Sequence, residues 1–99
     1  MLVHFVLFWL KKGTSAEVRE EFRKGLESLR AVKHVEALYV GTAMPSDRPV
    51  VDKSYDFALT VICRDARALE AYQADPVHRA FVDKNRPRWE RNLVYDAVG

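Results

Sequence analysis

The 99-residue chain is poor in the residues that mark specialised proteins, with one cysteine, three histidines, four glycines and four prolines. Cys63 cannot form an internal disulfide, which is typical of a reducing compartment, so we expect a cytoplasmic protein. The scattered glycines form no phosphate-binding loop. Because the histidines have no paired ligand spacing, the sequence predicts no metal site.

The chain also lacks an excess of either charge: its formal net charge is +2. Basic residues gather late in the sequence with acidic residues between them, which is typical of a solvated helix face, and we expect no nucleic-acid partner. These basic residues are Lys84, Arg86, Arg88 and Arg91. The apolar run 2–10 is too short to span a membrane and has no basic start, so neither a membrane partner nor a signal peptide is expected.

What the chain does contain is a regular series of apolar segments that fits one domain over residues 1–99. Composition predicts strands at 2–10, 35–41, 55–63 and 92–98. A capping box of Thr14 and Glu17 predicts a first helix, and a second helix from Asp65 is broken at Asp75-Pro76 and ends near 86. The order β-α-β-β-α-β indicates an α+β, ferredoxin-like fold: an antiparallel sheet with both helices on one face.

The two strands that this fold places at the centre of its sheet, 2–10 and 55–63, are apolar on both faces. Helices cover only one face, so the other would be an exposed apolar patch larger than monomers usually carry. We therefore predict a homodimer whose open sheet faces pack together around a barrel-like interior. A monomer with a wet, partly apolar sheet is the alternative.

The break in the second helix is the most informative segment. Asp75 can cap free backbone N–H groups and Pro76 suits the first position of a helix, so a new helix begins at this pair. His78 then falls in the first turn of the new helix, and Tyr72 lies at the end of the preceding one. We expect their side chains to face one hollow, with His4 of the first strand nearby.

These residue types point to acid–base chemistry or to ligand binding. His78 is the candidate general base, and Tyr72 is the candidate hydrogen-bond donor to an oxyanion. A carboxylate on an apolar strand face is costly unless it is paired, so we expect Asp96 to orient His78. Each also has a structural interpretation, with His78 as a first-turn helix residue, His4 as a hydrogen-bonded core residue and Tyr72 as simple packing.

Four segments covering nearly the whole chain are distinctive as a set. They are Val3-His4-Phe5-Val6-Leu7-Phe8, the strand that Tyr55 leads, Leu69-Glu70-Ala71-Tyr72 with Asp75-Pro76-Val77-His78 and Phe81-Val82, and the closing Leu93-Val94-Tyr95-Asp96. Together they resemble the stress-responsive A/B barrel (Dabb) family, most specifically in the Tyr…Pro-x-His…Phe segment. The resemblance implies homodimers of ferredoxin-like subunits whose sheets form a dimeric α+β barrel.

Most members of that family have no assigned activity, but one plant member is a polyketide cyclase that closes a linear poly-β-keto thioester by aldol chemistry. The resemblance implies that His78 corresponds to its general base and Tyr72 to the tyrosine nearby. It likewise implies that Asp96 orients the base, that His4 lines the pocket and that Trp89 is a wall residue.

Two positions depart from that enzyme. Phe57 stands where the cyclase has a further pocket histidine, and Asp75 replaces a histidine before the proline. Both changes leave the proposed base in place, and Phe57 makes the expected pocket more apolar.

Three functions remain open from the sequence. The first is a homodimer that binds a small hydrophobic or aromatic metabolite beneath the broken helix, in a pocket lined by His4, Phe57, Tyr72, His78, Phe81 and Trp89. The second is a cofactor-independent cyclase, lyase or isomerase that uses His78 on an activated carbonyl compound. The third is a purely structural, stress-induced dimer. We expect no cofactor, although the wider barrel group includes monooxygenases and haem degraders, in which His4 or His78 would be a haem ligand.

Overall fold

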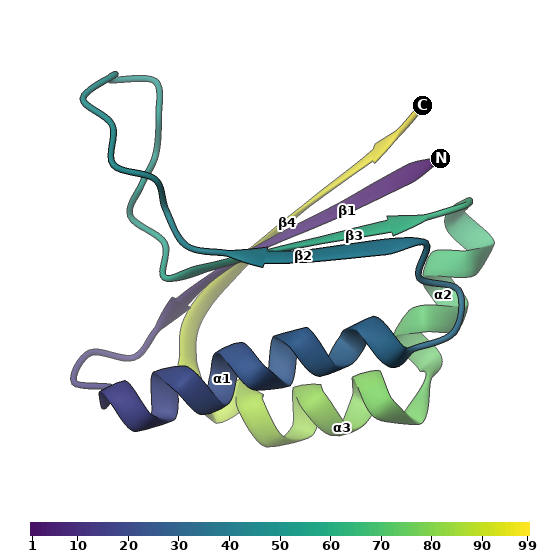
Figure 1. Ribbon diagram of the computed structural model, residues 1–99, viewed down its shortest axis with the longest axis horizontal. Coiled ribbons are helices and arrows are strands. Elements are labelled where there is room, and N and C mark those ends of the chain that lie inside the picture. Colours follow the sequence, from purple (N-terminus) through teal and green to yellow (C-terminus); the bar gives the residue numbers. More distant parts are fainter.

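The computed structural model describes residues 1–99 as a four-stranded antiparallel sheet with three helices on one face (Figure 1). The strand order is β2-β3-β1-β4, so β1 and β3 are central, and the predicted ferredoxin-like α+β fold is confirmed. The elements are β1 (Leu2–Leu10), α1 (Ala16–Ser28), β2 (Ala37–Gly41), β3 (Phe57–Cys63), α2 (Ala66–Ala74), α3 (Pro76–Asn85) and β4 (Trp89–Val98), with short 3-10 helices at Leu29–Ala31 and Arg86–Arg88.

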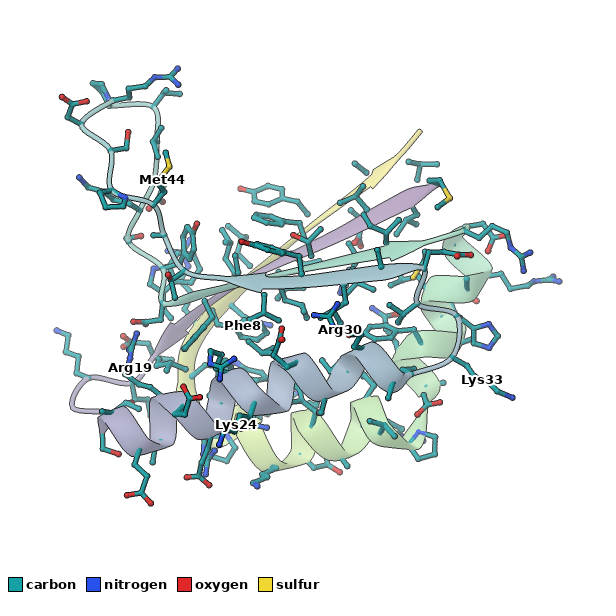
Figure 2. All side chains as sticks on the ribbon, in the orientation of Figure 1. Phe8, Arg19, Lys24, Arg30, Lys33 and Met44 are labelled. Carbon is teal, nitrogen blue, oxygen red and sulfur yellow. The ribbon has the colours of Figure 1, made fainter.

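The core lies between the sheet and the helices. Successive side chains of a strand point to opposite faces, and on β1 the side chain of Phe8 points toward the helices (Figure 2). Val6, two residues earlier on the same face, belongs to the same core. Phe8 packs edge-on against Phe22 of α1, with ring centroids 5.2 Å apart. Cys63 at the end of β3 is fully buried in this core, as expected for a small apolar residue.

Several element boundaries differ from those predicted. α1 is capped by Ser15, which accepts a hydrogen bond from the Val18 N–H at 3.1 Å, because the Thr14 hydroxyl donates to the Lys11 carbonyl in the preceding turn. β2 begins at residue 37 rather than 35, and β3 at 57 rather than 55. β4 begins at 89 rather than 92, since Trp89 pairs with Leu10 through an irregularity in the β1–β4 register.

The break between α2 and α3 has the predicted chemistry. Asp75 has extended backbone angles, and its carboxylate accepts a hydrogen bond from the Val77 N–H at 2.8 Å, while Pro76 begins α3. Asp65 caps α2 in the same way through the Ala68 N–H at 2.9 Å. None of the helices has the length and apolar composition that crossing a bilayer requires.

Gly25 lies where α1 passes close to α3. A Cβ atom at this position would meet the ring of Phe81 at 3.1 Å, closer than nine in ten real contacts of this kind. The absence of a side chain at residue 25 therefore sets how closely the two helices approach and fixes the place of the Phe81 ring.

The sheet face opposite the helices is also rich in apolar side chains, and we call it the open face. Cross-strand register places Phe5 beside Thr60 and Tyr95 on this face, and places Leu7 beside Ala58 and Leu93. Other members are Val3, Trp9, Tyr39 and Ile62. The predicted two-faced apolar character of the central strands is thus present.

The long loop 42–56 projects beyond the sheet on the side away from the helices (Figure 1). Its base is held by Asp56, which accepts hydrogen bonds from the Leu10 N–H at 2.7 Å and from the Arg19 guanidinium at 2.9 Å. Met44 on this loop is 73% exposed (Figure 2). Apart from the contact of Asp56 with Arg19 of α1 at its base, the loop extends away from the helices (Figure 1).

The Asp75 cap can be tested by substitution. Asp75→Ala should lower the free energy of unfolding by about 1 kcal/mol, because loss of an N-cap side chain typically costs that much. Chemical denaturation measures the change. Asp83→Ala is the control, since Asp83 is an exposed residue of α3 outside the cap. Equal unfolding midpoints for the two variants would contradict the capping role.

Candidate functional site

A cavity of about 170 Å³ lies between the sheet and the broken helix. Its walls come from β1, β3, β4, α2, α3 and the 3-10 helices that follow α1 and α3, and most of the lining residues are hydrophobic. Five of the residues singled out from the sequence line it: His4, Tyr72, His78, Phe81 and Trp89. The structure therefore brings these side chains to one place, although their roles there remain predictions.

His4 and Asp96 form a hydrogen-bonded pair at one side of the cavity. They are direct partners across β1 and β4, and Nδ1 of His4 lies 2.6 Å from Oδ1 of Asp96. The carboxylate oxygen accepts and Nδ1 of His4 donates in this pair, so the second ring nitrogen, Nε2, has no partner in the protein. His4 is 5% exposed, whereas the Asp96 side chain is nearly half exposed. The pair thus links the buried imidazole to the surface.

This pairing corrects the expectation that Asp96 orients His78. Directly opposed residues of antiparallel strands have adjacent side chains, and this adjacency gives the carboxylate to His4. His78 comes from a helix and has a different partner: its Nδ1 lies 3.1 Å from the carbonyl oxygen of Gln73. A carbonyl only accepts, so Nδ1 of His78 carries the proton and Nε2 is the free acceptor.

The helix break supplies this partner for His78. In a continuous helix the Gln73 carbonyl would accept from the N–H of residue 77. The Val77 N–H donates to Asp75 instead, so the Gln73 carbonyl is available to the imidazole. The same break that opens the cavity therefore sets the tautomer of His78.

Burial lowers the pKa of His78 from its ordinary value of 6.5. Its hydrogen bond to Gln73 and the nearby Asp75 act in the opposite direction, while His4 lowers the pKa further. Because the lowering effects dominate, the imidazole is neutral at pH 7. A neutral imidazole with a free Nε2 can accept a proton or a hydrogen bond from a bound molecule.

Tyr72 is the one buried polar side chain in the molecule without a hydrogen-bond partner. It is fully buried, its hydroxyl contacts no acceptor or donor of the protein, and its ring lies 4.7 Å from that of His78 between centroids. Burial raises the pKa of the hydroxyl, which therefore stays protonated and can donate. Buried polar groups are nearly always paired, so this hydroxyl is suited to a ligand oxygen.

Phe57 does not line the cavity, contrary to expectation. It lies on β3 under α1, with its ring centroid 5.6 Å from that of Phe22 and the Arg19 guanidinium 5.5 Å above it. β3 and β4 flank β1 on opposite sides, and the cavity is lined by three residues of β4 but by Leu59 alone from β3. Phe57 is therefore part of the core, and the more apolar pocket inferred from it does not follow.

Sequence reasoning missed three polar residues of the cavity wall: Gln73, Arg86 and Asn92. Asn92 faces the helices because it lies opposite Phe8 on β1. The last strand was predicted to begin only at residue 92, so the sequence did not indicate which face this side chain is on. Arg86 was assigned with its basic neighbours to a solvated face. Arg86 directly follows α3 and comes four residues after Val82, which also lines the cavity. Residues four apart on a helix share a face, so this spacing could have predicted that Arg86 lines the cavity too.

The residues present do not fit a haem. The cavity of about 170 Å³ is smaller than the roughly 300–1,000 Å³ of usual small-molecule sites. The histidines themselves do not exclude a haem, since His4 and His78 each use Nδ1 in a hydrogen bond and leave Nε2 without a protein partner, as metal-bound histidines commonly do; the size of the cavity is what excludes it. No three His, Cys, Asp or Glu side chains gather in a way that could hold a metal ion.

Solved structures share this fold over the whole chain. A Dabb family protein with a ferredoxin-like fold from Mesorhizobium loti is 29% identical, with a TM-score of 0.78 over 99% of this chain and 95% of that one. A dimeric ferredoxin-like protein of unknown function from Thermobifida fusca is 21% identical, with a TM-score of 0.81 and coverage of 99% and 90%. The hydroxynitrile lyase from Passiflora edulis is 15% identical, with a TM-score of 0.83 and coverage of 99% and 92%.

The family comparison agrees with the fold. A search of curated proteins finds no match. The model of the stress responsive A/B barrel domain matches residues 2–98, which is nearly the full chain. The chain therefore belongs to the stress responsive A/B barrel domain (Dabb) family.

Proposed function

We propose that the protein binds a small hydrophobic or aromatic metabolite in the cavity beneath the broken helix. The observation that carries this function is the buried, unpartnered hydroxyl of Tyr72 in the wall of an otherwise largely apolar cavity. A protein cavity of about 150 Å³ holds benzene, so about 170 Å³ suits one ring with a small substituent. An oxygen on that substituent would accept from Tyr72.

We also propose that two copies associate through their open faces. Support comes from the apolar side chains on both faces of β1 and from the dimeric ferredoxin-like proteins of the same fold. Packing Phe5 and Tyr95 against a second sheet would remove apolar surface from water, which is the main favourable term in such associations. A cytoplasmic location belongs to this proposal, because the lone buried Cys63 is suited to a reducing compartment.

Catalysis by His78 is a second candidate function. The observation that favours it is the fixed tautomer, which leaves a neutral Nε2 as a base in the same cavity as the Tyr72 hydroxyl. Such a base would remove a proton beside a carbonyl group while Tyr72 donates to the enolate oxygen. The hydroxynitrile lyase from Passiflora edulis is an enzyme of this fold, which supports the fold as a scaffold for catalysis. A purely structural dimer is the remaining alternative, and it requires that no ligand binds.

The binding function predicts opposite effects of Tyr72→Phe on stability and on affinity. Removing an unpaired buried hydroxyl should leave the free protein as stable or more stable by about 1 kcal/mol. Affinity for acetophenone, whose carbonyl would accept from Tyr72, should fall about fivefold, while affinity for ethylbenzene should not change. Thermal unfolding and calorimetric titration measure both. Tyr55→Phe is the control, and failure of acetophenone to bind the wild type would refute the function.

The dimer is tested by placing a charge on the open face. Phe5→Glu should reduce the mass in sedimentation equilibrium from two chains to one, because a buried unpaired carboxylate is strongly unfavourable. Val77→Glu is the control, since Val77 is exposed on α3 at the helix side. A wild type that sediments as one chain at high concentration would exclude the proposed association.

The catalytic candidate predicts exchange of the α-hydrogens of acetophenone in heavy water, followed by NMR. Because the pKa of His78 lies below 6.5, the base is already neutral above that pH, and the rate should stay level from about pH 8 to 6.5 and fall below it. His78→Gln should lower the rate about 100-fold or more. His34→Asn, a change at an exposed residue with positive φ, should have no effect. Binding without exchange would leave the binding function and exclude this one.

A further inference from the structure

Arg86 is the one charged side chain that lines the cavity. It follows the last residue of α3, is exposed to solvent, and makes neither an ion pair nor a hydrogen bond through its guanidinium. No aspartate or glutamate belongs to the cavity wall. A cation therefore faces this largely apolar space without a protein anion to neutralise it.

Arg86 differs in this respect from several other arginines of the chain. Arg19 pairs with Asp56 at 2.9 Å, and Arg88 pairs with Glu21 at 3.8 Å. Arg91 lies over the ring of Trp9, with its guanidinium carbon 4.2 Å from the ring centroid. These side chains have structural partners, whereas nothing in the fold uses the guanidinium of Arg86.

Arg86 also lies where the cavity meets the surface. A shallow surface hollow beside α3 shares Gln73, His78, Val82 and Arg86 with the cavity, so the two spaces adjoin along these side chains. Arg79 and Asp83 are the other charged residues of this hollow, and they offset each other. The charge facing a molecule that enters from this side is therefore that of Arg86.

Two polar residues of the wall bear on the charge and orientation of a ligand, in addition to the histidines, Gln73 and Asn92 that also line it. The Tyr72 hydroxyl is fully buried and requires an acceptor, while the Arg86 guanidinium at the mouth provides several N–H donors in a planar fork. A guanidinium of this kind binds a carboxylate through two parallel hydrogen bonds. Phe81 and Trp89 supply apolar surface for a ring.

We propose that the ligand of this cavity is a small apolar monoanion, with a carboxylate bound by Arg86 at the mouth and the ring inside. This inference rests on the proposed binding function and adds the charge of the ligand to it. A cavity of this kind binds acids more tightly than neutral compounds of the same size, and it does not bind amines.

Three probes of equal size and different charge test the inference: phenylacetate, phenylacetamide and 2-phenylethylammonium. Each is titrated into the full chain and followed by NMR chemical shifts. The wild type should bind phenylacetate about fivefold more tightly than phenylacetamide, since an ion pair at a partly exposed site contributes about 1 kcal/mol. It should bind 2-phenylethylammonium least. High salt should reduce the preference for the acid.

Arg86→Gln should abolish the preference for phenylacetate while leaving the affinity for phenylacetamide unchanged. Arg79→Gln, which removes an equal charge outside the cavity wall, should keep most of the preference. Equal binding of acid and amide by the wild type would overturn the anionic ligand and leave the binding function standing. The same loss of preference in both variants would overturn the role of Arg86, and no binding of any probe would overturn both proposals.

Discussion

The site depends on Pro76, through which α2 cannot continue. Proline has no backbone N–H to donate, and its ring clashes with the carbonyl of the preceding helical turn. Asp75 satisfies the freed N–H of Val77, and the new helix leaves in another direction along α1 (Figure 1). The cavity lies at the interruption. Gln73 keeps a carbonyl without its helical partner, and that carbonyl holds His78. The ring of Pro76 thus interrupts the helix where the cavity lies, leaves the Gln73 carbonyl free to accept a hydrogen bond, and thereby fixes the tautomer of His78.

The two histidines of the cavity have different hydrogen-bond partners. His4 is held by a carboxylate that reaches the surface, so a positive charge on its ring would have a counterion. His78 is held by a neutral carbonyl, and burial disfavours its charged form. Such a difference between neighbouring titratable groups is common where one group must give a proton and another must take it. Tyr72 lies against both rings.

The fold was predictable because the signals for it are local. Residue composition indicated the strands, capping residues indicated the helices, and Asp75-Pro76 indicated the break. The gathering of His4, Tyr72 and His78 followed from the fold. The partner of Asp96 was not predictable, because it depends on which residue of β1 lies opposite it, and strand register is a long-range property. The predicted cavity wall wrongly included Phe57 and omitted Gln73, Arg86 and Asn92, since the side of β1 on which the cavity lies depends on helix placement.

Gly25 lies outside the cavity, yet it governs the position of Phe81, which forms part of the cavity wall. A methyl group at residue 25 would press on this ring, and the ring would yield toward the cavity or α3 would move outward. The shape of the cavity can therefore be altered from the far side of its wall, at a residue that does not line it and with every polar group of the site unchanged.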